Sequence, residues 1–139
     1  MRVHHAPEPE TDMIKQRTMG RTGLKLSELS LGTLNFGWKT AEKSAHAILD
    51  AYYAAGGNFI QASSWSPELM LPSASTSRSE EIVGRWWLTR RIPREKLLLA
   101  TRIHVRPPTE GARNFIEVVR DAVQDSMRRL RTQDRKSVV

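Results

Sequence analysis

The spacing of apolar residues changes along this chain, and each change predicts a new element. Apolar and polar residues alternate around a Gly-Arg-Thr-Gly turn. This predicts a hairpin of residues 15–18 with 24–26, followed by a strand at 29–33. The short apolar runs "NFIQA" and "KLLLATRI" predict two further strands, both suited to burial.

Three segments instead carry apolar residues at helical spacing: "TAEKSAHAILDAYYAAGG", "SEEIVGRWWLTRR" and "NFIEVVRDAVQDSMRRLR". We expect Thr40 to cap the first helix and Gly56 and Gly57 to end it. Ser77 and Ser79 are cap candidates for the second helix. The residues expected to face the core from the first and third helices are Ala45, Ile48, Leu49, Tyr52, Tyr53, Phe115, Val118, Val119, Ala122, Met127 and Leu130.

Strands that alternate with helices indicate an α/β fold with a parallel sheet. The strands are nearly continuous apolar runs, as expected when both faces of a sheet are covered. Periodicity alone leaves an open doubly wound sheet and a barrel both possible. No G-x-G-x-x-G follows the first predicted strand, which disfavours a Rossmann dinucleotide fold.

Composition narrows the class of protein. With 139 residues, 39% hydrophobic and 27% charged, the chain suits one soluble domain without disulfides, since it has no cysteine. It lacks an apolar run of the roughly 18 residues that span a bilayer and the apolar core of a signal peptide. We therefore expect a cytoplasmic location and no membrane association. Residues 1–13 are polar, contain two prolines and show no periodicity, so we expect them to form a disordered tail.

The net charge of +7 raises the question of nucleic-acid binding. The basic residues are spread over the predicted helices and mixed with acidic ones, and no nucleic-acid-binding motif accompanies them. An arginine-rich solvated surface explains the charge better. His4 and His5 are adjacent, which is poor spacing for one metal ion, so no metal site is predicted.

Several blocks of the sequence, in order over residues 14–132, resemble the aldo-keto reductase family. "RTMGRTGLKLSELSLGTLNFGW" is similar to its opening hairpin and first strand, and "AILDAYYAAGGNFI" to its first helix and second strand. "SEEIVGRW", "EKLLLATR" and "VRDAVQDSMRRLRT" follow as its second helix, third strand and third helix. The resemblance implies the first part of a (β/α)8 TIM barrel, a hairpin plus about three β–α units. A complete barrel needs about 250 residues.

The resemblance also implies a chemistry, NADP-dependent reduction of carbonyls or oxidation of alcohols. The family uses a tyrosine as proton donor, a lysine that lowers its pKa, an aspartate paired with that lysine, and a histidine. The aspartate position falls on Gln61, the tyrosine on or next to Ser66, and the lysine on Arg102. The histidine position falls beyond the matching residues. We therefore expect no intact catalytic group in this chain.

Two further features follow from the same resemblance. Gly32 and Thr33 match positions that approach the cofactor, although a tight turn at a strand end would equally explain them. The loop at residues 63–77 is longer than the family's, and loops at this end of a barrel form the site. Trp65 in it is either a pocket wall or an exposed aromatic. The alternatives are a rebuilt reductase and a non-catalytic barrel, a pseudoenzyme that binds a nucleotide or a protein partner.

The last residues, "QDRKSVV", are charged and unlike a barrel strand. A common short-read sequencing adapter containing GAT CGG AAG AGC GTC GTG TAG translates to the sequence of residues 134–139 and a stop. We therefore expect residues 133–139 to be an artefactual tail. Residues 14–132 of this chain would then be a fragment of the product of a longer gene. Other codons for residues 134–139 would contradict this expectation.

Overall fold

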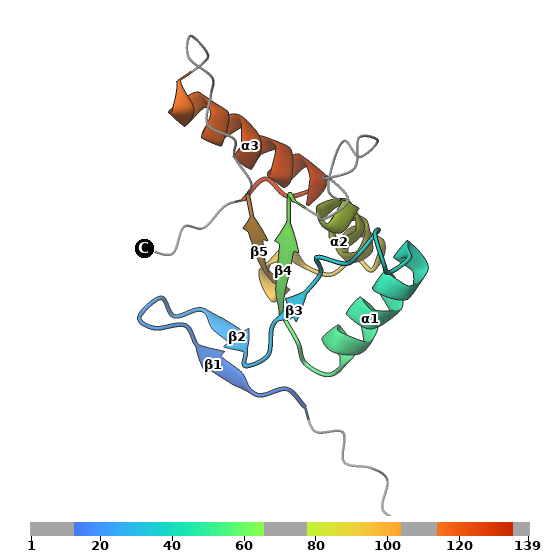
Figure 1. Ribbon diagram of the computed structural model, residues 1–139. Coiled ribbons are helices and arrows are strands. Elements are labelled where there is room, and N and C mark those ends of the chain that lie inside the picture. The colour runs from blue at the N-terminus through green and yellow to red at the C-terminus, as the bar shows by residue number, and fades with distance from the viewer. Residues whose placement is uncertain (1–12, 66–77, 104–113, 135–139) are drawn as a thin grey trace, which may run out of the picture.

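The computed structural model describes residues 13–65, 78–103 and 114–134 (Figure 1). All the predicted elements are present in these residues. In chain order they are β1 (Gln16–Thr18), β2 (Lys25–Ser27), β3 (Leu31–Gly32), α1 (Glu42–Ala54), β4 (Phe59–Ser63), α2 (Arg78–Thr89), a 3-10 turn (Arg94–Lys96), β5 (Leu98–Arg102) and α3 (Phe115–Arg129).

The central sheet is parallel, with strand order β3-β4-β5. This order confirms the predicted succession of β–α units. Leu31, Ile60 and Leu99 occupy one level of the sheet, and the next level places Gly32, Gln61 and Ala100 side by side. Successive residues of a strand point to opposite faces, so these two levels face opposite ways.

The helices α1, α2 and α3 lie on one face of the sheet (Figure 1). The core forms there, around side chains such as Trp86, Leu49, Ile60, Ile82 and Val83, each at most 1% exposed. The opposite face carries no helix among the described residues, so the expectation that both faces are covered does not hold for them. In a complete barrel this second face lines the interior and is covered by the other strands. Strands that are apolar on both faces are therefore compatible with the structure.

The antiparallel hairpin of β1 and β2 lies at the amino ends of the parallel strands (Figure 1). The Ser27 amide donates to Asn58 Oδ1 at 2.8 Å, and the Ile14 amide donates to the carbonyl of Ala55 at 2.8 Å. The Tyr52 hydroxyl joins the hairpin to the sheet, because it lies 2.7 Å from Ser27 Oγ and 2.9 Å from the carbonyl oxygen of Phe59. The hairpin thus covers the end of the sheet opposite the carboxyl ends.

The free edge of β5 borders a groove of about 1030 Å³. None of the described residues pairs with this edge, since β4 is the only described partner of β5. Leu98 and Ala100 of β5 line the groove together with Val123 and Met127 of α3. The apolar β5 side chains are accordingly only half-buried.

Each described helix ends in a Schellman motif. After α1, the amides of Gly56 and Gly57 donate to the carbonyls of Tyr53 and Tyr52, and Gly56 has a φ of 88°. The predicted glycine stop is therefore confirmed. The corresponding left-handed positions after α2 and α3 are Arg91 and Arg131, with φ of 52° and 55°.

The helix starts differ from prediction. The residue that caps α1 is Ala41, without a side-chain hydrogen bond, so the prediction of Thr40 was wrong. Ser79 lies inside α2, where its hydroxyl is 2.7 Å from Thr33 Oγ1, and is not the cap either. Ser77 lies outside the described residues. Asn114 caps α3 by accepting from the Ile116 amide at 3.1 Å.

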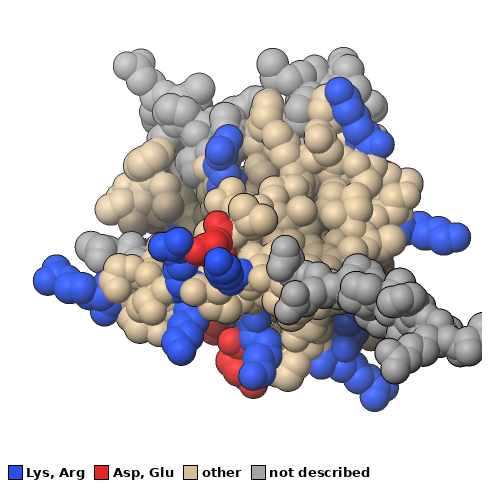
Figure 2. All heavy atoms as spheres, turned by 90° about the horizontal axis from the view of Figure 1, so that it is seen from below, with Lys and Arg blue, Asp and Glu red and all other residues tan. Residues whose placement is uncertain are grey.

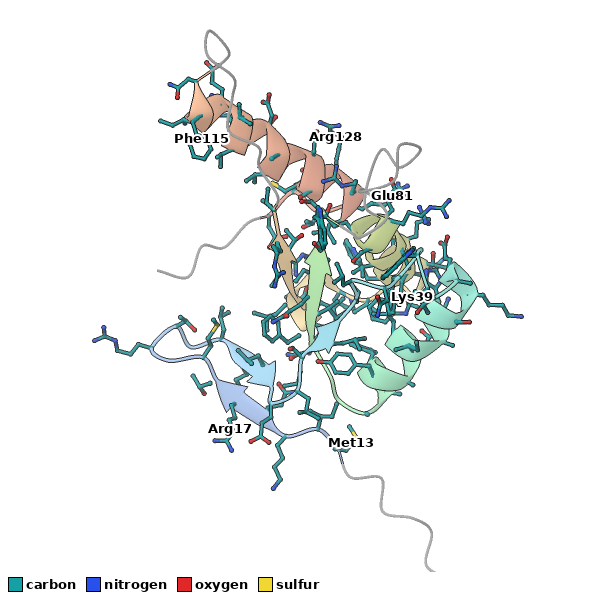
Figure 3. All side chains as sticks on the ribbon, viewed as in Figure 1. Met13, Arg17, Lys39, Glu81, Phe115 and Arg128 are labelled. Carbon is teal, nitrogen blue, oxygen red and sulfur yellow. The ribbon has the colours of Figure 1, made fainter. Side chains whose placement is uncertain are left out.

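The first turns of α3 extend beyond the sheet. Phe115, predicted to face the core, is 53% exposed and lies at the far end of this helix (Figure 3). That prediction was wrong because the amphipathic pattern of α3 begins at residues that lie beyond the sheet. The described residues offer no packing surface there. Ile48 of α1, 42% exposed, departs from prediction in the same way, whereas Ala45 and Leu49 are fully buried as predicted.

The fully buried carboxylate of Glu80 joins α2 to α3 and β5. It accepts hydrogen bonds from Arg129 Nε at 2.6 Å and from the Thr101 hydroxyl at 2.5 Å. Gly84, one turn later on α2, allows the end of α3 to approach. A Cβ at this position would lie 2.3 Å from the carbonyl oxygen of Arg129.

Two bidentate ion pairs join α1 to α2 and to Arg90, the residue that follows α2. Arg85 binds Glu42 at 2.7 and 3.0 Å, and Arg90 binds Asp50 at 2.9 and 2.7 Å. The hydrogen bond from Arg85 lowers the pKa of the Glu42 carboxyl group. The hydrogen bond from Arg90, assisted by that from the Trp86 indole, lowers the pKa of Asp50.

Candidate functional site

The carboxyl ends of β3, β4 and β5 surround a hollow of about 300 Å³. Its lining residues come from all three strands and the turn after β3, and they are Gly32, Thr33, Leu34, Gln61, Ala62, Ser63, Ala100, Thr101 and Arg102. Ligand sites of β/α barrels lie at this end of the strands. The structure therefore brings together four of the five residues that the sequence singled out.

Gln61 lies at the middle of β4, on the face of the sheet that carries no described helix. Its neighbours at the same level, Gly32 and Ala100, are small. A Cβ placed on Gly32 would have no atom within 4 Å. The Gln61 side chain is exposed and makes no hydrogen bond to another described residue. Its carboxamide is therefore available to a ligand.

Arg102 ends β5 and stands at the same level as Ser63. It lies on the same face as Gln61, because Ala100, two residues earlier in the strand, is the partner of Gln61. The Arg102 side chain is exposed and forms no ion pair or hydrogen bond with any described residue. Of the described residues that line the hollow, Arg102 is the one with a charged side chain, and none is a carboxylate.

Thr33 serves a structural purpose through its side chain. It is fully buried, and its hydroxyl lies 3.1 Å from the carbonyl of Gln61 and 2.7 Å from Ser79 Oγ. Together with the Thr33 amide, which donates to the same carbonyl at 3.0 Å, these contacts hold the end of β3 against β4 and α2. The side chain is thus already satisfied within the protein.

Ser66, the predicted tyrosine position, lies outside the described residues. Trp65, just before it, is half-buried, and its amide donates to Ser63 Oγ at 3.1 Å. Ser63 and Ala100 are lining residues that the sequence analysis missed. The register of parallel strands would have indicated both, because every second residue toward the carboxyl end of a strand returns to the same face.

Neither a metal centre nor a membrane segment is found in the described part of the chain. Residues 13–65, 78–103 and 114–134 hold no cluster of three or more metal-ligating side chains. No helix within these ranges has the length and apolarity needed to span a bilayer. His4 and His5 lie outside them. Figure 2, seen from the hairpin end, shows Lys and Arg side chains spread around the face with some acidic residues between them.

The sequence profile of the Aldo/keto reductase family matches residues 28–138. This chain therefore belongs to the aldo-keto reductase family. The uncharacterized oxidoreductase YrpG of Bacillus subtilis is 32% identical over an alignment of 123 positions, which covers 82% of this chain and 36% of that protein. The protein tas of Escherichia coli is 34% identical over an alignment of 120 positions, which covers 80% of this chain and 33% of that protein.

Another relative is the aryl-alcohol dehydrogenase [NADP(+)] of Phanerodontia chrysosporium. It is 30% identical over an alignment of 147 positions, which covers 91% of this chain and 36% of that enzyme. The chain thus spans about a third of the length of these three curated relatives.

A crystal structure from Pseudomonas aeruginosa, assigned to the aldo-keto reductases, superposes with a TM-score of 0.64 at 26% identity. The match covers 87% of this chain and 45% of that one. The fold is accordingly the first part of a (β/α)8 TIM barrel, as the sequence predicted.

Proposed function

We propose that this chain supplies the first β–α units of an NADP-dependent oxidoreductase-type barrel and does not itself carry out the family's reaction. The observation that supports this most directly is the pair of side chains in the hollow. Gln61 and Arg102 both line the hollow and stand where the family resemblance implies an aspartate and a lysine, and no hydrogen bond joins their side chains.

The chemistry of the two side chains supports the absence of proton transfer. The Gln61 carboxamide carries no charge and cannot form an ion pair with a lysine. The Arg102 guanidinium stays protonated at any usable pH, so it has no proton to relay. A proton donor contributes about 10²–10⁴ in rate, and only within hydrogen-bond reach of the reacting oxygen.

The described residues do not fit the whole cofactor that the family implies. A hollow of about 300 Å³ lies at the small end of ligand pockets and is too small for a dinucleotide. Of the two residues expected to approach NADP, Gly32 is open to the hollow but the Thr33 side chain is buried. We expect the 139-residue chain not to bind NADPH with useful affinity.

The test is a fluorescence and thermal-shift titration of the chain with NADPH, together with NADPH consumption over a panel of simple aldehydes. No fluorescence change, no thermal shift and no turnover are expected at millimolar NADPH. An intact aldo-keto reductase is the positive control. A dissociation constant in the micromolar range, or measurable turnover, would refute the proposal.

The second candidate function is a non-catalytic barrel that binds a nucleotide or a protein partner. The guanidinium of Arg102, which has no partner among the described residues, favours it, because a cation can bind a ligand without any proton transfer. If the longer protein is instead a reductase, its substrates are small carbonyl compounds or alcohols, as its family suggests. The same proposal includes a cytoplasmic location. It also includes the division of the chain into a tail (residues 1–13), a partial barrel domain (residues 14–132) and an artefactual tail (residues 133–139).

A further inference from the structure

The hollow at the carboxyl ends of the strands has the chemistry of an anion site. Arg102 is exposed and unpaired among the described residues, and the described residues that line the hollow include no carboxylate to neutralise it. A guanidinium presents a planar fork of N–H donors that matches the two oxygens of a carboxylate. Within residues 13–65, 78–103 and 114–134, the positive charge at the hollow therefore has no partner.

A second polar group lies on the same face. Gln61 is at the level of Ala100, one step of two residues before Arg102. The two side chains do not hydrogen-bond each other, and the small residues Gly32 and Ala100 leave space beside Gln61. An oxyanion that accepts from Arg102 can accept from the Gln61 amide as well.

We propose that the hollow formed by Gly32, Gln61 and Arg102 binds a small monocarboxylate. One guanidinium and one amide match a single negative charge, whereas a phosphate dianion would leave charge and acceptor oxygens without donors among the described residues. Leu34 and Ala100 offer apolar contact to a short carbon chain. The inference rests on the proposed function, because it takes the hollow as a binding site without the family's proton transfer.

The probe is sodium acetate, with ionic strength held constant by exchange against sodium chloride. We expect saturable shifts of the backbone amide signals of Gln61, Ser63 and Arg102, with a dissociation constant in the millimolar range. Arg102→Gln should weaken binding at least tenfold. Arg102→Lys, which keeps the charge but loses the fork, should weaken it less.

The matched control is Arg21→Gln in the exposed hairpin turn, which removes the same charge away from the hollow. It should leave acetate binding unchanged. Equal weakening by Arg21→Gln and Arg102→Gln would mean a general charge effect and overturn the site. So would the absence of saturable shifts.

Inorganic phosphate is the competing probe, and binding as tight as that of acetate would overturn the monocarboxylate assignment. If Arg102→Gln does not fold, shown by circular dichroism, Arg102→Lys decides, and unchanged acetate affinity in it overturns the proposal. NADPH binding distinguishes the two proposals. Micromolar NADPH affinity overturns the proposed function, whereas missing acetate shifts overturn only this inference.

Discussion

Glu80 is a charged residue in a fully buried position. A carboxylate is seldom fully buried unless it is paired, and the pairing here is complete, with Arg129 on one oxygen and Thr101 on the other. Breaking such a pair is costly because the remaining ion stays in a poorly solvated place. Arg129, with its side chain 20% exposed, would be that ion.

Glu80→Gln should lower the free energy of unfolding by about 3 kcal/mol, which is typical for loss of one partner of a buried pair. Urea unfolding followed by circular dichroism measures it. Glu81→Gln is the matched control, because Glu81 is the next residue of α2 and its carboxylate is 38% exposed (Figure 3). It should cost less than about 0.5 kcal/mol. Equal effects would mean that the buried pair contributes little.

The residues of the site were predictable to different degrees. Gln61, Arg102, Gly32 and Thr33 followed from motif resemblance, and the structure brings them to one hollow. The burial of the Thr33 hydroxyl was not predictable, because its hydrogen-bond partner Ser79 belongs to a different element, α2. Glu80 escaped prediction for the same reason. In the sequence it is one of two adjacent acids at a helix start, and only packing distinguishes it from Glu81.

At the scale of elements, helix ends show where local sequence signals suffice and where they fail. The Gly56-Gly57 stop was predicted because glycine adopts a left-handed conformation without cost. Arg91 and Arg131 hold the same conformation with a side chain, so nothing in the sequence marks them. The hydrogen bonds of the Schellman motif impose that conformation on them.

Arg131→Gly should stabilise the protein by up to about 1 kcal/mol. A left-handed conformation costs a residue with a Cβ roughly 1–2 kcal/mol, and the greater freedom of glycine in the unfolded chain offsets part of the gain. Thermal unfolding measures the change. Arg128→Gly, within α3, is the control and should destabilise by about 1 kcal/mol. A loss of stability in Arg131→Gly would mean that its side chain has an unrecognised contact.

The stability contributed by the ion pairs of Glu42 and Asp50 should depend on pH. Because the folded state lowers the pKa of Glu42 and Asp50, their contribution is fully present above the ordinary carboxyl pKa of about 4. It is lost as the pH falls through the lowered values. Both carboxylates are more than 40% exposed, so the effect is modest.

The measurement compares the native chain with the double variant Glu42→Gln, Asp50→Asn by urea unfolding at pH 7 and at pH 3. The difference in stability between the two proteins should be larger at pH 7. A difference independent of pH would assign the effect of the substitutions to packing and not to charge.

At the scale of the whole molecule, the sheet ends at β5 with a free edge beside an apolar groove of about 1030 Å³. A strand edge with unpaired N–H and C=O groups is a template for pairing with another chain. The order of strands and helices was predictable from periodicity. The exposure of Phe115 was not, because periodicity identifies an apolar face without saying what covers it.

We expect the 139-residue chain to self-associate through this edge. Light scattering coupled to size exclusion should show a mass that rises with concentration. Leu98→Lys places a charge in the groove and should reduce association, as charges on edge strands do. Leu88→Lys, at a leucine of α2 that is 44% exposed, is the control and should not. Association unchanged by Leu98→Lys would place the contact elsewhere.

The anchoring of α3 at one end has a consequence for its local opening. Two tertiary contacts of this helix lie near its carboxyl end: Arg129 donates to Glu80, and the Trp87 indole donates to the carbonyl of Leu130 at 2.9 Å. Phe115 and Ile116, at the other end, are 53% and 63% exposed. Amide hydrogens at residues 119–122 should therefore exchange with deuterium much faster than those at 127–130, because helices open first where few buried contacts hold them. Uniform protection would mean that α3 opens only with the whole fold, and the gradient would make its first turns the part most readily remodelled by a neighbouring chain.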